Sequence, residues 1–407
     1  MYKHVVNGIP LFTTTSKIPE QFQYLTEDIE TEVVIVGGGV IGAVLGYYFS
    51  KEGISTVIIE KSRVAHGSSC ITTALLEYEL DDNFTYLFEK ELAGEDIIQA
   101  YLLGINALKD LSSFISTYGN QCEFSVRDTF VFTTKENEIK VFLDEYNIRK
   151  SNGLPVEYFT NENNPFPFEI KAGVYAENGG ATLNPFLFTH QLINVGQKFG
   201  LQVYENTEAT HIEYFEESVE VTTSYNYKIR SKIILIASGY NTSNFTNKIF
   251  GSKSTTFNIV TEPNVPLDSW YKLANIRDNE EPYHYLRTTP DNRIIFGGED
   301  CNKQIHQLTM KDKAEHYNKL EKRLKQMFPD VKNASIEYKY CGTFASTNDN
   351  LGYFGPDPDE PKRWYSLGYG ANGIVFSIIA GMYLPKLFRG EKVEEISIFL
   401  PSRRDFT

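Results

Sequence analysis

The sequence predicts an α/β protein of two domains, one with a doubly wound parallel sheet and one with an antiparallel sheet, so that the chain is α+β overall. Its 407 residues are too many for one small core and suit two domains. Segments 33–36, 56–59 and 233–236 are unbroken apolar runs, which are typical of parallel strands covered on both faces. Segments 124–133 and 211–225 alternate instead, as antiparallel strands with one wet face do.

The first unit, residues 31–61, has the order strand, glycine turn, helix, strand and acid. This order predicts a dinucleotide-binding βαβ unit, with Gly37 in the tight turn, Gly39 beside a pyrophosphate and Gly42 where helix and strand pack closely. The free N–H groups and the positive dipole end of the helix face the phosphates. Glu60 stands about 20 residues beyond the glycines, where the fingerprint has an acid that accepts hydrogen bonds from a ribose.

The elements after this unit follow from periodicity. Apolar residues recur at helical spacing in segment 84–118, which predicts two amphipathic helices. We also expect helices at 135–149, 186–199 and 311–328, a Pro-rich loop at 161–168, and an N-terminal arm at 1–30.

Composition excludes several classes of partner and site. The formal net charge of −14 disfavours nucleic acid and anionic lipid as partners. The longest apolar stretch, near 374–384, is too short for an integral membrane segment, and the N-terminus lacks the apolar region of a signal peptide. Four cysteines lack metal-ligand spacing and fit free thiols in a reducing compartment, so we expect a cytoplasmic protein without a metal site. These cysteines are Cys70, Cys122, Cys301 and Cys341.

Three separated blocks of the chain point to one family. The first block is the glycine turn with Glu60. The second is the small-residue run 67–76, and the third combines segments 341–355 and 368–374. Together they resemble the D-amino-acid oxidase-like (DAO) superfamily of FAD-dependent oxidoreductases, which includes glycine oxidase, sarcosine oxidase and the D-amino-acid dehydrogenases. A nicotinamide-dependent enzyme has no need of the second and third blocks.

The resemblance implies a Rossmann-like FAD-binding domain built from segments 31–80, 178–240 and 336–390. A substrate domain with a large antiparallel sheet would comprise residues 81–177 and 241–335. FAD would be bound non-covalently, with the backbone of the 370–374 loop facing the flavin N1 edge, where negative charge develops. The residues expected to bind FAD are Gly37, Gly39, Val40, Ile41, Gly42, Glu60, Lys61, Gly67, Ser68, Ser69, Thr72, Thr73, Ala209, Thr210, Ala237, Ser238, Gly239, Gly342, Gly370, Ala371, Asn372, Gly373 and Ile374.

The chain departs from the family at the substrate anchors. Glycine oxidase-like members have an arginine where this chain has Ala371, and sarcosine oxidase-like members have a lysine where it has Val375. Arg287 is the predicted replacement, because arginine grips a carboxylate through two hydrogen bonds. Tyr285 and His284, in the same stretch, are the other candidates for substrate contact.

The expected reaction is oxidation of a C–N bond in a small amine or amino acid, by hydride transfer to the flavin and hydrolysis of the resulting imine. One alternative is a FAD enzyme that acts on a 2-hydroxy acid or polyol, with His284 as the base. Another is a FAD-binding subunit without catalysis. The sequence leaves open the substrate, its stereochemistry, the oligomeric state, and the electron acceptor, which could be oxygen, a quinone or a carrier protein.

Overall fold

The computed structural model describes residues 5–90, 92–370 and 372–403, and the strands within these ranges form three sheets. The first is a six-stranded sheet in the order β19-β20-β13-β3-β4-β9, parallel except at β19. The strands are β3 Val33–Val36, β4 Thr56–Ile59, β9 Gln202–Tyr204, β13 Ile233–Ile236, β19 Tyr353–Pro356 and β20 Arg363–Leu367.

Both faces of the six-stranded sheet are covered, as its apolar strands predict. On one face Val33 and Ile35 share a core with helices α2 Val40–Lys51, α6 Pro185–Gln197 and α8 Gly373–Phe388. On the other face Val34 and Val36 pack against a second, four-stranded sheet and not against helices. Its strands are β2 Ile29–Glu30, β10 Ala209–Tyr214, β11 Val219–Thr223 and β12 Lys228–Ser231.

The third sheet is large and almost entirely antiparallel, in the order β1-β18-β14-β17-β16-β15-β6-β8-β5, with β7 added beside β8. The pair β15 and β6 runs parallel. The strands are β1 Val6–Gly8, β5 Leu75–Glu77, β6 Ser125–Thr133, β7 Val156–Phe159, β8 Ala172–Thr182, β14 Ser252–Thr261, β15 Asn275–Asp278, β16 His284–Thr288, β17 Ile294–Cys301 and β18 Ile336–Ser346.

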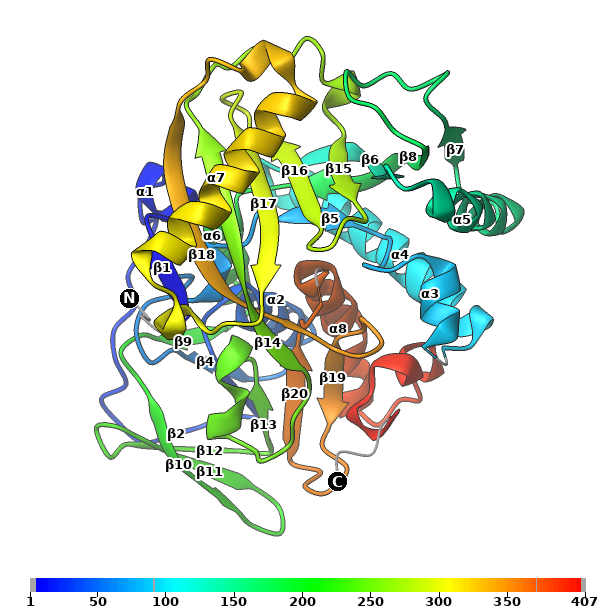
Figure 1. Cartoon of the computed structure of the whole chain (residues 1–407). Coiled ribbons are helices and arrows are strands. Elements are labelled where there is room, and N and C mark those ends of the chain that lie inside the picture. The colour runs from blue at the N-terminus through cyan, green and yellow to red at the C-terminus, as the bar shows by residue number, and fades with distance from the viewer. Residues whose placement is uncertain (1–4, 91, 371, 404–407) are drawn as a thin grey trace.

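Helices cover the large sheet at both ends. In Figure 1, α7 Met310–Met327 lies across β14, β17 and β18, and its Leu320 and Leu324 share a core with Phe257 and Ile259 of β14. The remaining helices are α1 Leu11–Thr15, α3 Phe84–Glu89, α4 Gly94–Tyr118 and α5 Ile139–Ser151. The two amphipathic helices predicted in segment 84–118 are therefore α3 and α4.

The strands of the six-stranded sheet all come from the segments 31–80, 178–240 and 336–390. The large sheet nevertheless takes β5, β18 and the end of β8 from the same segments, so these segments contribute to both sheets. The N-terminal segment is also more ordered than an irregular arm, since β1 pairs with β18 and α1 is buried through Leu11 and Phe12. The division of the chain into a cofactor domain and a substrate domain therefore stays a prediction.

Candidate active site

The turn between β3 and α2 brings distant backbone segments into contact. Gly37 has a φ of +121°, which favours glycine, and a Cβ there would lie 2.4 Å from the carbonyl oxygen of Ala237. A Cβ on Gly42 would lie 1.9 Å from the carbonyl oxygen of Gly37. The two glycines thus permit the start of α2 to pack against the ends of β3 and β13.

Glu60, at the end of β4, is oriented by backbone amides. Its Oε2 accepts a hydrogen bond from the N–H of Gly38, and its Oε1 accepts one from the N–H of Ser62, both at 2.9 Å. The side chain is buried and lines a cavity together with Lys61. The acid predicted from the sequence therefore has a fixed position at the edge of this cavity.

Segment 67–73 closes over the first turn of α2. The Oγ of Ser69 accepts a hydrogen bond from the N–H of Val40 at 2.9 Å, and a Cβ on Gly39 would lie 2.9 Å from the same oxygen. Gly39 has φ −78° and ψ −178°, which any residue can adopt. Its missing side chain therefore keeps space open in the cavity, whereas the turn itself does not require glycine at this position.

The N-terminal end of α8 faces the same cavity. The N–H of Gly370 donates to the carbonyl of Ala345 at 2.8 Å, and the side-chain amide of Asn372 donates to the carbonyl of Glu79. These bonds hold the loop before α8 against the large sheet. The first N–H groups of a helix lack intrahelical acceptors and favour negative charge, so α2 and α8 present two such ends to one cavity.

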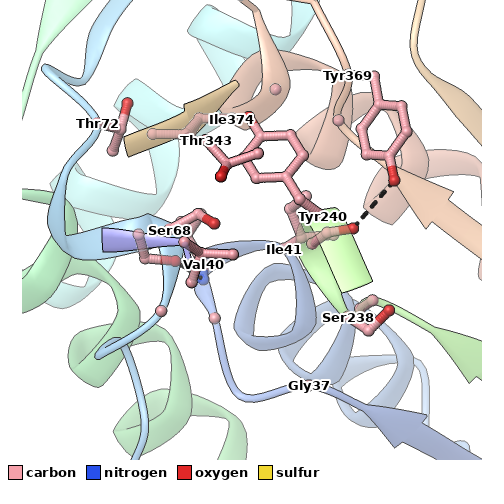
Figure 2. A pocket seen from close by; sticks show the side chains of 18 of the residues that line it. Gly37, Val40, Ile41, Ser68, Thr72, Ser238, Tyr240, Thr343, Tyr369 and Ile374 are labelled. Atoms are coloured by element: carbon pink, nitrogen blue, oxygen red, sulfur yellow. Dashed lines mark hydrogen bonds between the residues drawn. The ribbon is translucent and has the colours of Figure 1, made fainter. Parts of the chain in front are cut away.

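This cavity collects most of the residues predicted to bind the cofactor, and Figure 2 labels ten of the residues that line it. The predicted residues that line it are Gly37, Gly39, Val40, Ile41, Glu60, Lys61, Gly67, Ser68, Ser69, Thr72, Thr73, Ala209, Ala237, Ser238, Gly239, Gly370, Asn372, Gly373 and Ile374.

Four predicted cofactor residues are not found in the lining. Gly42 packs on Gly37, and Gly342 packs on Ile71, whose Cδ1 would lie 1.6 Å from an added Cβ. Thr210 is exposed and donates to the carbonyl of Thr222 at 3.0 Å; Ala209 beside it lines the cavity instead. Ala371 lies outside the described residues.

Beyond the cofactor segments the cavity continues to the large sheet. Thr256 on β14, Arg277 on β15 and Tyr285 on β16 line this part, together with Tyr283. The hydroxyl oxygens of Thr256 and Tyr285 are 2.8 Å apart, and the ring centroids of Tyr283 and Tyr285 are 5.6 Å apart. Aromatic and polar side chains on and beside three strands of the large sheet therefore form part of the cavity wall.

Arg277 is fixed in this wall by the segment that begins with β5. Its Nε lies 2.5 Å from Oε2 of Glu77, its Nη1 donates to the carbonyl of Asp81 at 3.3 Å, and its Nη2 donates to the carbonyl of Leu80 at 3.2 Å. Burial alone would lower the pKa of Arg277, but the charges of Glu77 and Asp81 raise it above its usual value. Glu77 and Asp81 also line the cavity.

At Glu77, in contrast to Arg277, the surroundings favour the uncharged form. Burial, together with the charges of Glu79 and Asp81, raises its pKa to about 8 against the opposing charge of Arg277. The sequence interpretation missed Glu77, Asp81 and Arg277 as site residues. The one available signal was the alternation of acids at 77, 79 and 81, which is also the pattern of an exposed strand edge.

The residues predicted to contact the substrate are separated by the structure. Tyr285 lines the cavity, but His284 and Arg287 do not. His284 places its Nδ1 2.9 Å from Oδ2 of Asp278. Arg287 is buried, donates to the carbonyl of Leu183 at 2.9 Å, and lies over the ring of Phe12 at 5.4 Å. The arginine in the cavity wall is therefore Arg277, and the predicted role of Arg287 as a carboxylate anchor lacks support from its position.

Comparison with known proteins agrees with this geometry. The DAO family model, described as "FAD dependent oxidoreductase", matches residues 32–387. The chain is 24% identical to YhfW of Bacillus subtilis (strain 168), named as a candidate Rieske 2Fe-2S iron-sulfur protein, over 96% of this chain and 74% of that protein. It is 21% identical to gamma-glutamylputrescine oxidoreductase of Escherichia coli (strain K12), over 91% of this chain and 86% of that protein.

The fold is shared with solved structures. The structure of glycine oxidase from Geobacillus kaustophilus matches with a TM-score of 0.78 and 18% identity, over 92% of this chain and 99% of that one. At this identity the match establishes the fold, and the chemistry of the site has to be argued from its own residues.

The residues of the cavity fit FAD. The bare backbone of Gly39 in the cavity lining and the N-terminal end of α2 suit a pyrophosphate, and the fixed carboxylate of Glu60 suits a ribose. The backbone at Gly373 and Ile374 suits the electron-rich edge of a flavin. The buried Oγ of Ser238, also in the lining, has no hydrogen-bond partner among the described residues. Among those residues, no group of His, Cys, Asp and Glu could hold a metal ion, and no helix is long and apolar enough to span a bilayer.

Proposed function

Because the chain belongs to the DAO family of FAD-dependent oxidoreductases, we propose that it oxidises a C–N bond of a small amine or amino acid. When bound, FAD would supply the acceptor for a hydride from the carbon next to the nitrogen, the nitrogen would lose a proton, and water would hydrolyse the resulting imine. The observation that supports this proposal is the continuity of the cavity. It joins the cofactor segments to a wall of Arg277, Tyr283 and Tyr285 on the large sheet.

The protein's own part in this reaction is to bind and orient the substrate and to exclude water. Tyr240 and Tyr369 also line the cavity, with ring centroids 5.5 Å apart, and the hydroxyl of Tyr369 donates to the carbonyl of Gly239 at 3.2 Å. These rings form an apolar wall near the loop before α8 (Figure 2). Such a wall limits access of water to the reacting carbon.

The position of His284 favours oxidation of a C–N bond over oxidation of a hydroxy acid. A hydroxyl substrate needs a base for its proton, and His284 was the predicted one. Its ring lies between Asp278 and Glu299, outside the cavity lining. A neutral amine, in contrast, needs no side-chain base before hydride transfer.

The free thiols of Cys70, Cys122 and Cys341 agree with our proposal of a cytoplasmic location.

An anaerobic substrate screen tests the proposal. Purified protein is mixed with amines, amino acids, 2-hydroxy acids and polyols, and loss of the yellow flavin absorbance is followed. We expect bleaching by amines or amino acids and no bleaching by the hydroxy compounds. Bleaching by hydroxy acids or polyols alone would overturn the proposed reaction. Mixing the reduced protein with oxygen, a quinone or a carrier protein then identifies the electron acceptor.

The variant Gly39→Leu tests the cofactor site. The backbone at Gly39 accepts any residue, and the neighbour that an added Cβ displaces is the end of the Ser69 side chain, 2.9 Å away, so the fold should persist while the new side chain enters the cavity. We expect FAD affinity to fall by at least about tenfold, or about 1.4 kcal/mol, with an unchanged far-UV circular dichroism spectrum. The control is Gly53→Asn, since Gly53 has open space around it and asparagine tolerates its positive φ. Full retention of FAD by Gly39→Leu would place the pyrophosphate elsewhere.

A further inference from the structure

The wall of the cavity on the large sheet belongs to a buried cluster with more acids than bases. We define this acid cluster as Glu77, Glu79, Asp81, Glu145, Arg149 and Arg277. Arg149 lies 2.7 Å from Glu79 through Nη1 and 2.5 Å from Glu145 through Nε, and all three side chains are at most 1% exposed. Four carboxylates face two guanidinium groups, so the fully ionised cluster carries two excess negative charges. Buried excess charge is costly unless a counter-charge is supplied.

The arginine of the cluster is poorly placed to bind a substrate carboxylate. Its Nε is ion-paired with Glu77, while Nη1 and Nη2 donate to the carbonyls of Asp81 and Leu80. The Oδ1 of Asp81 lies a further 3.6 Å from Nη1. A bidentate grip requires two parallel N–H groups on one edge of the guanidinium. Both edges of Arg277 already face the segment 77–81.

The other side chains in this wall suit a cation. Tyr283 and Tyr285 lie side by side in the lining, and aromatic faces attract ammonium groups. Burial, together with the charge of Asp81, raises the pKa of Asp300, beside them, to about 6. The pKa of Glu77 is raised in part by the same excess of negative charge. A positively charged substrate group in the cavity would therefore offset the excess negative charge of the acid cluster. A substrate carboxylate would add to that excess.

We propose that the substrate is an amine recognised through a positively charged ammonium group, which lies against Glu77 and Asp81 beside the rings of Tyr283 and Tyr285, and that it needs no carboxylate. Where this nitrogen is also the one that is oxidised, it first passes a proton to one of these two carboxylates, and the carbon next to the resulting neutral amine then loses the hydride. This inference rests on the proposed oxidation of a C–N bond and narrows its substrate class. It also accounts for Ala371 and Val375, where relatives carry their carboxylate anchors. In this reading Arg277 positions Glu77 and partly offsets its charge, and it does not hold the substrate.

The test compares matched compounds on the FAD-loaded protein. Pentylamine, 1,5-diaminopentane, 5-aminopentanoate and norleucine share an amine and differ in the charge of a second group. We expect anaerobic bleaching to be faster with the monoamine or the diamine than with either carboxylate compound. Faster bleaching by 5-aminopentanoate or norleucine would overturn the inference and leave the proposed function standing.

Inert ions give a second measurement that does not depend on turnover. Tetramethylammonium and acetate are titrated at constant ionic strength, and the perturbation of the flavin spectrum is recorded. We expect tetramethylammonium to bind and acetate not to bind. Binding of tetramethylammonium without bleaching by any amine would support the cation site and contradict the proposed reaction, so the two failures are distinguishable. Binding of acetate alone would contradict the cation site.

Two variants and a control test whether Glu77 and Asp81 bind the cation. Glu77→Gln and Asp81→Asn should each weaken tetramethylammonium binding by at least about tenfold. Asp82→Asn is the matched control, because Asp82 contacts Lys90 and Asn350 and does not line the cavity. The affinity of the Asp82→Asn variant for tetramethylammonium should stay within about twofold of the parent value. Asp81 is the more exposed of the two acids, so its variant keeps the test valid if Glu77→Gln fails to fold. Unchanged affinity in a folded Asp81→Asn variant would refute the proposal.

Discussion

Arg277 and Arg287 are both buried in the large sheet, but their surroundings are opposite. Arg277 lines the cavity and is ion-paired with Glu77, and neighbouring carboxylates raise its pKa. Arg287 lies outside the lining, where burial lowers its pKa to about 10. Among the described residues, no carboxylate forms an ion pair with Arg287; a backbone carbonyl and the ring of Phe12 are its contacts. Burial of an arginine therefore does not by itself indicate a substrate anchor.

Strand pairing explains the difference. Arg277 of β15 pairs with Tyr285 of β16, so the two side chains share the face that reaches the cavity. Arg287 follows Tyr285 by two positions and lies on the same face of β16. At Arg287, however, α1 of the N-terminal segment covers the sheet through Phe12. Position along the strand, and not the choice of face, separates the two arginines.

The largest effect is expected from removing the charge of Arg277. In Arg277→Met the carboxylate of Glu77 and two backbone carbonyls lose their partner, and breaking a buried ion pair costs about 3–5 kcal/mol. The free energy of unfolding in urea measures this loss. In the double variant Glu77→Gln with Arg277→Met, no carboxylate at position 77 is left without its partner, so the destabilisation should be smaller than the sum of the two single effects. Additive effects would show that the pair is not coupled.

A smaller effect is expected from pH on cation binding. Glu77 faces Arg277 of β15, Arg149 of α5, and Glu79 and Asp81 of its own segment. Its pKa is raised to about 8, and a cation prefers the ionised carboxylate. Affinity for tetramethylammonium, which does not titrate, should therefore fall by up to about tenfold per pH unit below that pKa and level off above it.

The variant Glu77→Gln should largely remove this pH dependence, because the titrating group is gone. Titrations of parent and variant from about pH 6 to about pH 9 provide the measurement. A pH profile that is the same in both proteins would assign the titration to another group, such as Asp300, whose pKa is raised to about 6 by burial.

The cofactor end of the cavity could be predicted from the sequence because its signals are local. Gly37, Gly39 and Glu60 fall within one βαβ unit, and their spacing alone fixes their positions around the start of α2. The predictions at Gly42 and Gly342 identified close packing but not cavity lining, since a glycine required by a neighbouring backbone or side chain looks the same in the sequence as one beside a ligand.

The substrate end could not be predicted in this way. It combines β5, β14, β15 and β16, and Glu77 meets Arg277 across 200 positions of the chain. Which of two arginines reaches the cavity depends on how far the N-terminal segment extends over the sheet. For that segment the sequence predicts only an arm, because its short helix and strand carry no periodic pattern long enough to recognise.

The smallest effect is expected from Arg287→Met, and it separates the two readings of the site. If Arg287 bound a substrate carboxylate, its loss would raise KM for a carboxylate substrate by about tenfold or more. Its position outside the cavity predicts instead a KM within about twofold of the parent value for any substrate. Stability should change by no more than about 1 kcal/mol, because methionine replaces an incompletely paired buried charge with an apolar group of similar length. Steady-state kinetics and urea unfolding of Arg287→Met, with Arg277→Met measured in parallel, show which of the two arginines affects KM for the substrate.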